Sequence, residues 1–199
     1  MWDVVIAVEA LLCVVFGCAA VAKLRSREAL AVFVRALSDL RILPRRAVRP
    51  VATLVAVGEA AVAAGLLVAC LAAFGLPMRF DARIPAALGL LTGAALLGGF
   101  TGTIVIALRR GIRKPCPCFG RAARPLGVRH VVRNLLLLCA ALGGAAACAL
   151  LAPPAALPAP EALTAVLAGA VCACPFVYVD DIVELFAPET TESIVQNRN

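Results

Sequence analysis

Residues 4–22, VVIAVEALLCVVFGCAAVA, form an apolar run that is interrupted by one acidic side chain, Glu9. Because about 20 apolar residues in a helix cross the hydrocarbon core of a bilayer, this run predicts a transmembrane helix. The neighbouring basic residues begin only at Lys23, after the run, whereas a cleavable signal peptide carries its basic residues before the apolar part. We therefore expect this helix to remain in the mature protein.

Four more apolar stretches follow, at residues 51–76, 84–108, 135–152 and 163–179. The chain has 199 residues, of which 63% are hydrophobic and 16% charged, and its mean hydropathy is +0.98. These values exclude an ordinary soluble domain. The last stretch is short and contains Pro175, so it is either a fifth span or a re-entrant or tilted segment. The sequence predicts an all-α integral membrane bundle with a four-helix core and a fifth helix.

The basic residues gather in two segments, 23–50 and 109–133, which contain eight Lys and Arg residues each. The connection at 77–83 has two, and the one at 153–161 has none. Since basic loops stay on the cytoplasmic side, we expect both basic segments to face the cytoplasm of a bacterial inner membrane, with the N-terminus outside. The net charge of +7 is then matched by lipid headgroups of the bilayer rather than by nucleic acid.

Two further features bear on packing. Residues 28–43 carry apolar side chains near helical spacing with charged residues between them, which predicts a helix in the membrane interface that ends at Pro44; Pro50 would then open the second span. The spans are rich in Ala and Gly, as in residues 89–102, which favours close helix packing. We interpret the pairs Gly98-Gly99 and Gly143-Gly144 in the same way.

The motif Pro-Cys-Pro-Cys-Phe-Gly at residues 115–120 places two thiols, Cys116 and Cys118, one residue apart in a basic segment. Such a pair can exchange between a dithiol and a disulfide, and nearby cations favour the reactive thiolate. Three basic residues flank the motif: Arg113, Lys114 and Arg121. Cys116 and Cys118 are therefore the candidate catalytic residues, and the alternative is a rigid loop in which both are incidental.

The same spacing recurs at Cys172 and Cys174 in the fifth apolar stretch. With Cys18 and Cys139 in the inner half-spans, these thiols could form an exchange relay, although cysteine is also an ordinary small apolar residue in an Ala-rich helix. A structural zinc site would need Cys172 and Cys174 beside the loop cysteines. We expect no metal and no cofactor.

Glu59 and Glu9 are the acidic residues inside the predicted spans. Glu59 stands about nine residues into its span, ~13 Å at helical rise, close to the bilayer midplane. Because a charge there is costly, we expect Glu59 to be protonated or paired, facing the bundle interior as a packing contact or a proton carrier for thiol exchange. Glu9 lies nearer an end, where it reaches water more easily. The single histidine, His130, is interpreted as an interfacial side chain.

Several short motifs together resemble one family. They are Ala22-Lys23-Leu24-Arg25, Leu43-Pro44, Gly58-Glu59, Cys116-x-Cys118-Phe119-Gly120, Pro125-Leu126-Gly127 and Arg133-Asn134-Leu135. The combination resembles the MauE (methylamine utilisation protein) branch of the DoxX-like membrane proteins over residues 1–152. The resemblance implies a four-helix membrane domain and a redox-associated role in maturing the disulfide-rich small subunit of methylamine dehydrogenase. Only Cys116 and Cys118 fall on the thiols of the family motif.

The chain departs from that pattern in Pro117, in the extra segment 153–179 and in the acidic tail 180–199. We expect a thiol–disulfide oxidoreductase role with a thioredoxin-like partner and a disulfide-containing client. An exported client matures outside, whereas the charge bias places the motif inside, so either the thiols act across the bundle or the client differs. The rival interpretation is a non-redox assembly factor or a small-solute carrier. No motif indicates a nucleotide-driven or hydrolytic enzyme.

Overall fold

The computed structural model describes residues 1–75, 81, 83–112, 127–151 and 157–178, and within these the chain is all-α. The helices are α1 (Trp2–Leu24), α2 (Arg27–Asp39), α3 (Arg45–Ala72), α4 (Arg83–Arg109), α5 (Val128–Leu150) and α6 (Ala159–Val177). All except α2 are long and apolar enough to cross a membrane. The predicted helical bundle with five spans is confirmed, and α6 continues as one helix through Pro175.

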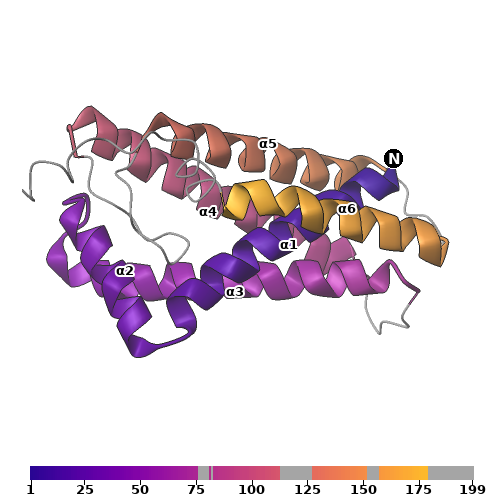
Figure 1. The fold of residues 1–199 in the computed structure, drawn as a ribbon, viewed down its shortest axis with the longest axis horizontal. Helices are drawn as coiled ribbons and strands as arrows, with labels where there is room; N and C mark the ends of the chain where they lie inside the picture. The colour runs from indigo at the N-terminus through magenta and orange to yellow at the C-terminus, as the bar shows by residue number, and fades with distance from the viewer. Residues whose placement is uncertain (76–80, 82, 113–126, 152–156, 179–199) are drawn as a thin grey trace, which may run out of the picture.

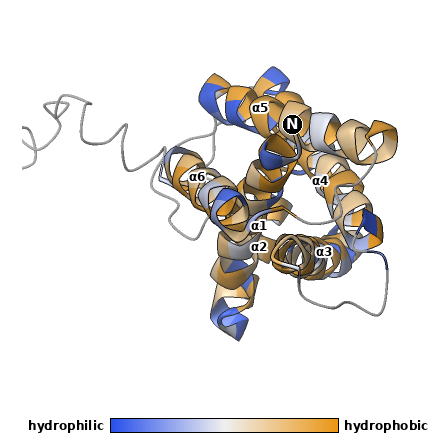
Figure 2. Cartoon of the chain, turned by 90° about the vertical axis from the view of Figure 1, so that its right-hand side faces the viewer, coloured by the Kyte–Doolittle hydropathy of each residue, from blue (hydrophilic) through white to orange (hydrophobic). Residues whose placement is uncertain are grey.

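Helix α1 is the central element of the bundle (Figures 1 and 2). It packs against α3, α5 and α6, and α4 closes the arrangement between α3 and α5. The hydrophobic colouring that covers most of the helices in Figure 2 fits a lipid-facing surface. We call the end at which α1 and α4 finish and α3 and α5 begin the α2 end, because α2 lies there, and the other end the opposite end.

Helix boundaries differ from the prediction at the α2 end. Helix α2 stops at Asp39 instead of continuing to Leu43, because Arg41 adopts a left-handed backbone conformation with φ 51°. Helix α3 begins directly after Pro44 and includes Pro50. Pro50 is the sixth residue of α3 and has no N–H to donate to the Arg46 carbonyl oxygen, yet the helix continues through it. Helix α5 starts seven residues before the predicted position 135, since the polar residues before it are helical as well.

Glycines allow close approach at three places in the core. Gly89 faces Leu66, Gly93 faces the ring of Phe16, and Gly144 faces Leu90, each so closely that an added Cβ would lie 3.0–3.4 Å from its neighbour. The expected role of glycine in packing is confirmed there. It is wrong for Gly98, Gly99 and Gly143, since a Cβ at those positions would meet nothing within 4 Å in the part of the chain that the structure describes.

Helix α6 lies against α1 through small buried residues: Ala162, Ala165, Gly169 and Ala173. At Gly169 the two helices are so close that a Cβ would collide with the backbone carbonyl of Ala7 and the side chain of Ala10. Helices in a membrane associate by such contact rather than by the hydrophobic effect. Gly169 therefore fixes the position of α6.

Replacing Gly169 with alanine should weaken the α1–α6 contact by at least about 2 kcal/mol, because the clash involves backbone atoms that cannot rotate away. The measurement is thermal stability in detergent together with the yield of monodisperse protein. Gly143→Ala is the matched control, since its Cβ enters open space. Equal stability of the two variants would show that the close crossing at Gly169 does not hold α6.

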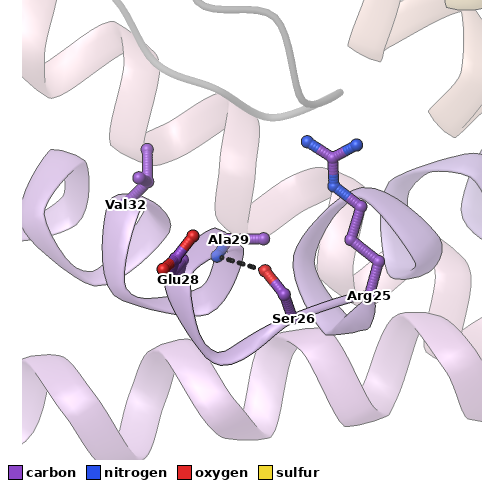
Figure 3. A pocket seen from close by; sticks show the side chains of 5 residues that line it. All are labelled: Arg25, Ser26, Glu28, Ala29 and Val32. Atoms are coloured by element: carbon purple, nitrogen blue, oxygen red, sulfur yellow. Dashed lines mark hydrogen bonds between the residues drawn. The ribbon is translucent and has the colours of Figure 1, made fainter.

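Helix α2 is amphipathic and packs on the bundle with its apolar face. Ser26 begins the helix by accepting a hydrogen bond from the Ala29 N–H at 3.0 Å, a typical N-cap (Figure 3). At the other end, Leu40 is buried in a small apolar cluster with Ile104 and Ala107 of α4. The predicted helix is thus confirmed; it packs on α3 and α1, and its C-terminal end meets the end of α4.

Candidate functional site

Cys116 and Cys118, the predicted catalytic residues, lie outside the described residues. The helices on either side of their segment are described, and both meet the α2 end. Ile112 after α4 and Val131 in α5 pack on the cluster formed by Leu40, Ile104 and Ala107. The side chain of Arg110 donates a hydrogen bond to the Arg41 carbonyl oxygen at 3.2 Å. The described residues before and after the cysteine segment therefore lie beside the end of α2.

A buried ion pair lies inside the bundle toward the same end. The Lys23 Nζ atom of α1 donates hydrogen bonds to both carboxylate oxygens of Glu59 in α3, each at 2.9 Å. The side chains are 1% and 2% exposed. The expectation that Glu59 is paired and faces the interior is confirmed.

Burial of the partner, Lys23, was not predicted. Lys23 belongs to the first basic segment, which was expected to lie outside the membrane as a loop. Lys23 lies within α1 on the same face as the buried residues Leu12, Phe16 and Ala19, at spacings of three and four. Helical side chains lean toward the N-terminus, so its Nζ also donates to the Ala19 carbonyl oxygen at 3.3 Å and enters the bundle. That spacing was the signal that could have identified it.

Two aromatic rings also lie near the ammonium group of Lys23. The Nζ atom lies 5.0 Å from the ring centre of Phe33 in α2 and 6.0 Å from that of Phe100 in α4. Both distances allow a cation–π attraction. The Lys23–Glu59 pair thus connects four helices, and Phe33, the buried residue of α2, brings that helix to it.

Helix α5 adds two buried polar residues, Arg133 and Asn134, near its start. Arg133 belongs to the second basic segment, which was predicted to be a loop, but it lies in α5 and in the protein interior. His130 accepts a hydrogen bond from the Gly127 N–H at 3.2 Å, so it caps α5. These residues give the α2 end most of the buried polar groups of the described chain, the exception being Glu9.

The remaining predicted thiols lie on the outside of the bundle. Cys172 and Cys174 of α6 are exposed, and so are Cys18 of α1 and Cys139 of α5. The Cys174 thiol donates to the Ala170 carbonyl oxygen at 3.8 Å, a contact within its own helix. Across the residues that the structure describes, no group of three or more His, Cys, Asp or Glu could hold a metal ion.

A second buried carboxyl group and a surface hollow lie outside the sites described above. Glu9, which was expected to reach water, is only 4% exposed, because the central position of α1 covers it even near the helix end. A hollow of about 490 Å³ opens at the α1–α2 turn (Figure 3). Its walls are Arg25, Ser26, Glu28, Ala29 and Val32, and both charged side chains are exposed, so it does not resemble an enclosed ligand site.

Comparison with known proteins gives one consistent result. The family model "Methylamine utilisation protein MauE" matches residues 1–147. The methylamine utilization protein MauE of Paracoccus denitrificans is 35% identical over 196 residues, which covers 96% of this chain and 94% of that protein. The alignment with that protein therefore extends over the residues of α6, whereas the family model ends at residue 147. No solved structure matches the chain.

Proposed function

Because this chain belongs to the family of the methylamine utilisation protein MauE, we propose that it carries out thiol–disulfide exchange in the maturation of a client protein. The observation that carries the proposal is the Cys116-x-Cys118 pair with basic residues on both sides. Cations next to a thiol favour the thiolate, which is the nucleophile in disulfide exchange.

The chemistry follows from the spacing of the pair. A disulfide between Cys116 and Cys118 closes a very short loop, and strained disulfides are the more oxidising ones. A thiolate of the client attacks one sulfur and forms a mixed disulfide, while the other loop sulfur leaves as a thiolate. A second client thiolate then resolves the mixed disulfide, so that the client is oxidised and the loop reduced. A thioredoxin-like partner in its disulfide form would restore the loop disulfide by exchange, and its own disulfide would be reduced to two thiols.

The described structure supports this proposal through the anchoring of the segment. The described residues on either side of it, Ile112 and Val131, pack beside the end of α2, and α2 in turn contacts the buried Lys23–Glu59 pair through Phe33. Exchange then takes place at the α2 end, which we place on the cytoplasmic side because the basic residues gather there.

The rival function, a small-solute carrier, is favoured by one observation. A buried ion pair inside a membrane bundle is a feature of transport pathways as well as of structural contacts. A carrier would leave the loop cysteines in one oxidation state under all conditions. The oxidation state of Cys116 and Cys118 therefore decides between the two functions.

We expect Cys116 and Cys118 to change oxidation state when cells are shifted between reducing and oxidising conditions. The experiment traps thiols in intact cells by rapid alkylation with a membrane-permeant maleimide and counts adducts by mass spectrometry. A parallel sample receives an impermeant maleimide, which should reach the pair only after the cytoplasmic face has been opened. An unchanging oxidation state would refute the exchange function, and labelling from outside would reverse the proposed orientation.

A further inference from the structure

Glu9 is a second buried carboxyl group, toward the opposite end of the bundle from the Lys23–Glu59 pair. It lies in the third turn of α1, 14 residues or ~21 Å along the helix from Lys23. Its side chain is 4% exposed, and it has no hydrogen bond or ion pair with any part of the chain that the structure describes. In this it differs from Glu59, whose charge is compensated by Lys23.

The neighbours of Glu9 are thiols from three helices. Cys70 of α3 and Cys148 of α5 are buried, and both lie within electrostatic range of the carboxyl group. Cys13 follows Glu9 by one turn on α1 and donates to the Ala63 carbonyl oxygen at 3.4 Å. None of these neutral thiols supplies the positive charge that a carboxylate requires.

Arg83, the basic residue described on this side of the bundle, does not bind Glu9. Arg83 of α4 lies in electrostatic range of Cys148, but its guanidinium donates to the carbonyl oxygens of Cys148 at 2.6 Å and Leu151 at 3.1 Å. It thereby satisfies the end of α5. The acidic residue of α6 is Glu161, in the exposed first turn of the helix. Its charge is negative and therefore cannot compensate Glu9.

An ionised carboxylate without a partner is costly in such a place. Transfer of an unpaired charge into a low-dielectric interior is strongly unfavourable, and the group responds by taking a proton. We propose that Glu9 is a proton-binding site inside the bundle, which carries its proton in the resting protein and is open to modification by lipid-soluble carbodiimides. This site is separate from the exchange proposed at Cys116 and Cys118.

Carbodiimide chemistry reports on that proton directly. The carboxylic acid adds across one C=N bond: its proton moves to nitrogen and its oxygen bonds to the central carbon, which gives an O-acylisourea. The acyl group then migrates to nitrogen and leaves a stable N-acylurea. No other reactant is consumed. An ion-paired carboxylate such as Glu59 has no proton to supply.

The test treats the full-length protein in lipid nanodiscs with dicyclohexylcarbodiimide and locates adducts by peptide mass spectrometry. We expect an adduct at Glu9 and at least tenfold less at Glu59, with labelling of Glu9 falling as the pH is raised. Infrared spectra should show the carbonyl band of a protonated carboxyl group, lost in Glu9→Gln and retained in Glu59→Gln. Labelling of Glu9 should return when the protein is brought back from alkaline to neutral pH, which shows that the protein has not unfolded.

Three results would overturn the proposal. The first is the absence of an adduct at Glu9, and the second is a carboxyl band that survives Glu9→Gln. The third is protection of Glu9 by sodium ions at constant pH, which would mean that a metal cation is bound in place of the proton. If Glu9→Gln does not fold, labelling of the unmodified protein still decides the question. Repeating the labelling with Cys116→Ser and Cys118→Ser should leave it unchanged, so this inference and the exchange function fail independently.

Discussion

Replacing Cys116 and Cys118 with serine, singly or together, should lower client disulfide formation by at least about 100-fold, because serine provides neither a thiolate nor a sulfur for a mixed disulfide. Protein levels in the membrane should stay normal, since the substitution is small. The measurement is the fraction of client that carries its disulfides, determined by alkylation and mass spectrometry in cells that lack the natural protein.

The chain contains its own matched control for that result. Cys172 and Cys174 have the same spacing but are exposed on α6. Their replacement with serine should leave client oxidation within about twofold of normal if the loop alone exchanges disulfides. A larger loss would assign them the auxiliary role that the repeated spacing suggested. Full activity without Cys116 and Cys118 would exclude the loop as the exchange site.

Breaking the Lys23–Glu59 pair should be the most destabilising change in the described structure. Glu59→Gln removes the negative charge that neutralises Lys23 inside the bundle, and the loss of one partner of a buried pair costs about 3–5 kcal/mol. Lys23→Met should cost less, because the Glu59 carboxyl group can take up a proton once the lysine charge is gone. Both variants are also expected to weaken the hold on α2, since Phe33 contacts the Lys23 ammonium group.

The double variant Lys23→Met/Glu59→Leu separates charge from packing. Replacing a buried ion pair with apolar residues of similar volume is often neutral for stability, so the double variant should recover most of what each single change loses. Unfolding in detergent and protease cleavage near α2 provide the measurements. Additive losses would mean that the two side chains act through separate packing contacts, and stable single variants would mean that the pair contributes little.

The five membrane helices could be predicted from the sequence because each is a long apolar run, a property of consecutive residues. Their starts were less predictable. Helix α5 begins at Val128, and its residues Arg133 and Asn134 are buried in the bundle. Basic residues beside an apolar run are typical of a loop, so the sequence predicts a later start. Local composition does not reveal that a neighbouring helix will cover a charged side chain.

The site illustrates the same limit. Burial and pairing of Glu59 followed from its place near the middle of an apolar span, but the partner is 36 positions away, and only helix packing brings the two together. Glu9 was assigned to water because it is close to a helix end. The sequence does not show that α1 is the central helix, which is the reason for its burial.

The buried Lys23 also has a consequence for how the protein is made. Helix α1 leaves the ribosome before Glu59 does, since 36 positions separate Lys23 from Glu59. A lysine placed alone in the hydrocarbon core costs roughly 2.5–3.5 kcal/mol on insertion scales. Until α3 enters the membrane, the lysine end of α1 is therefore best placed at the lipid headgroups. The final depth of the first helix is decided only when α3, the next membrane-spanning helix, has entered the membrane, so a protein truncated before α3 and released from the ribosome should leave α1 shallow and Lys23 open to water-borne amine reagents.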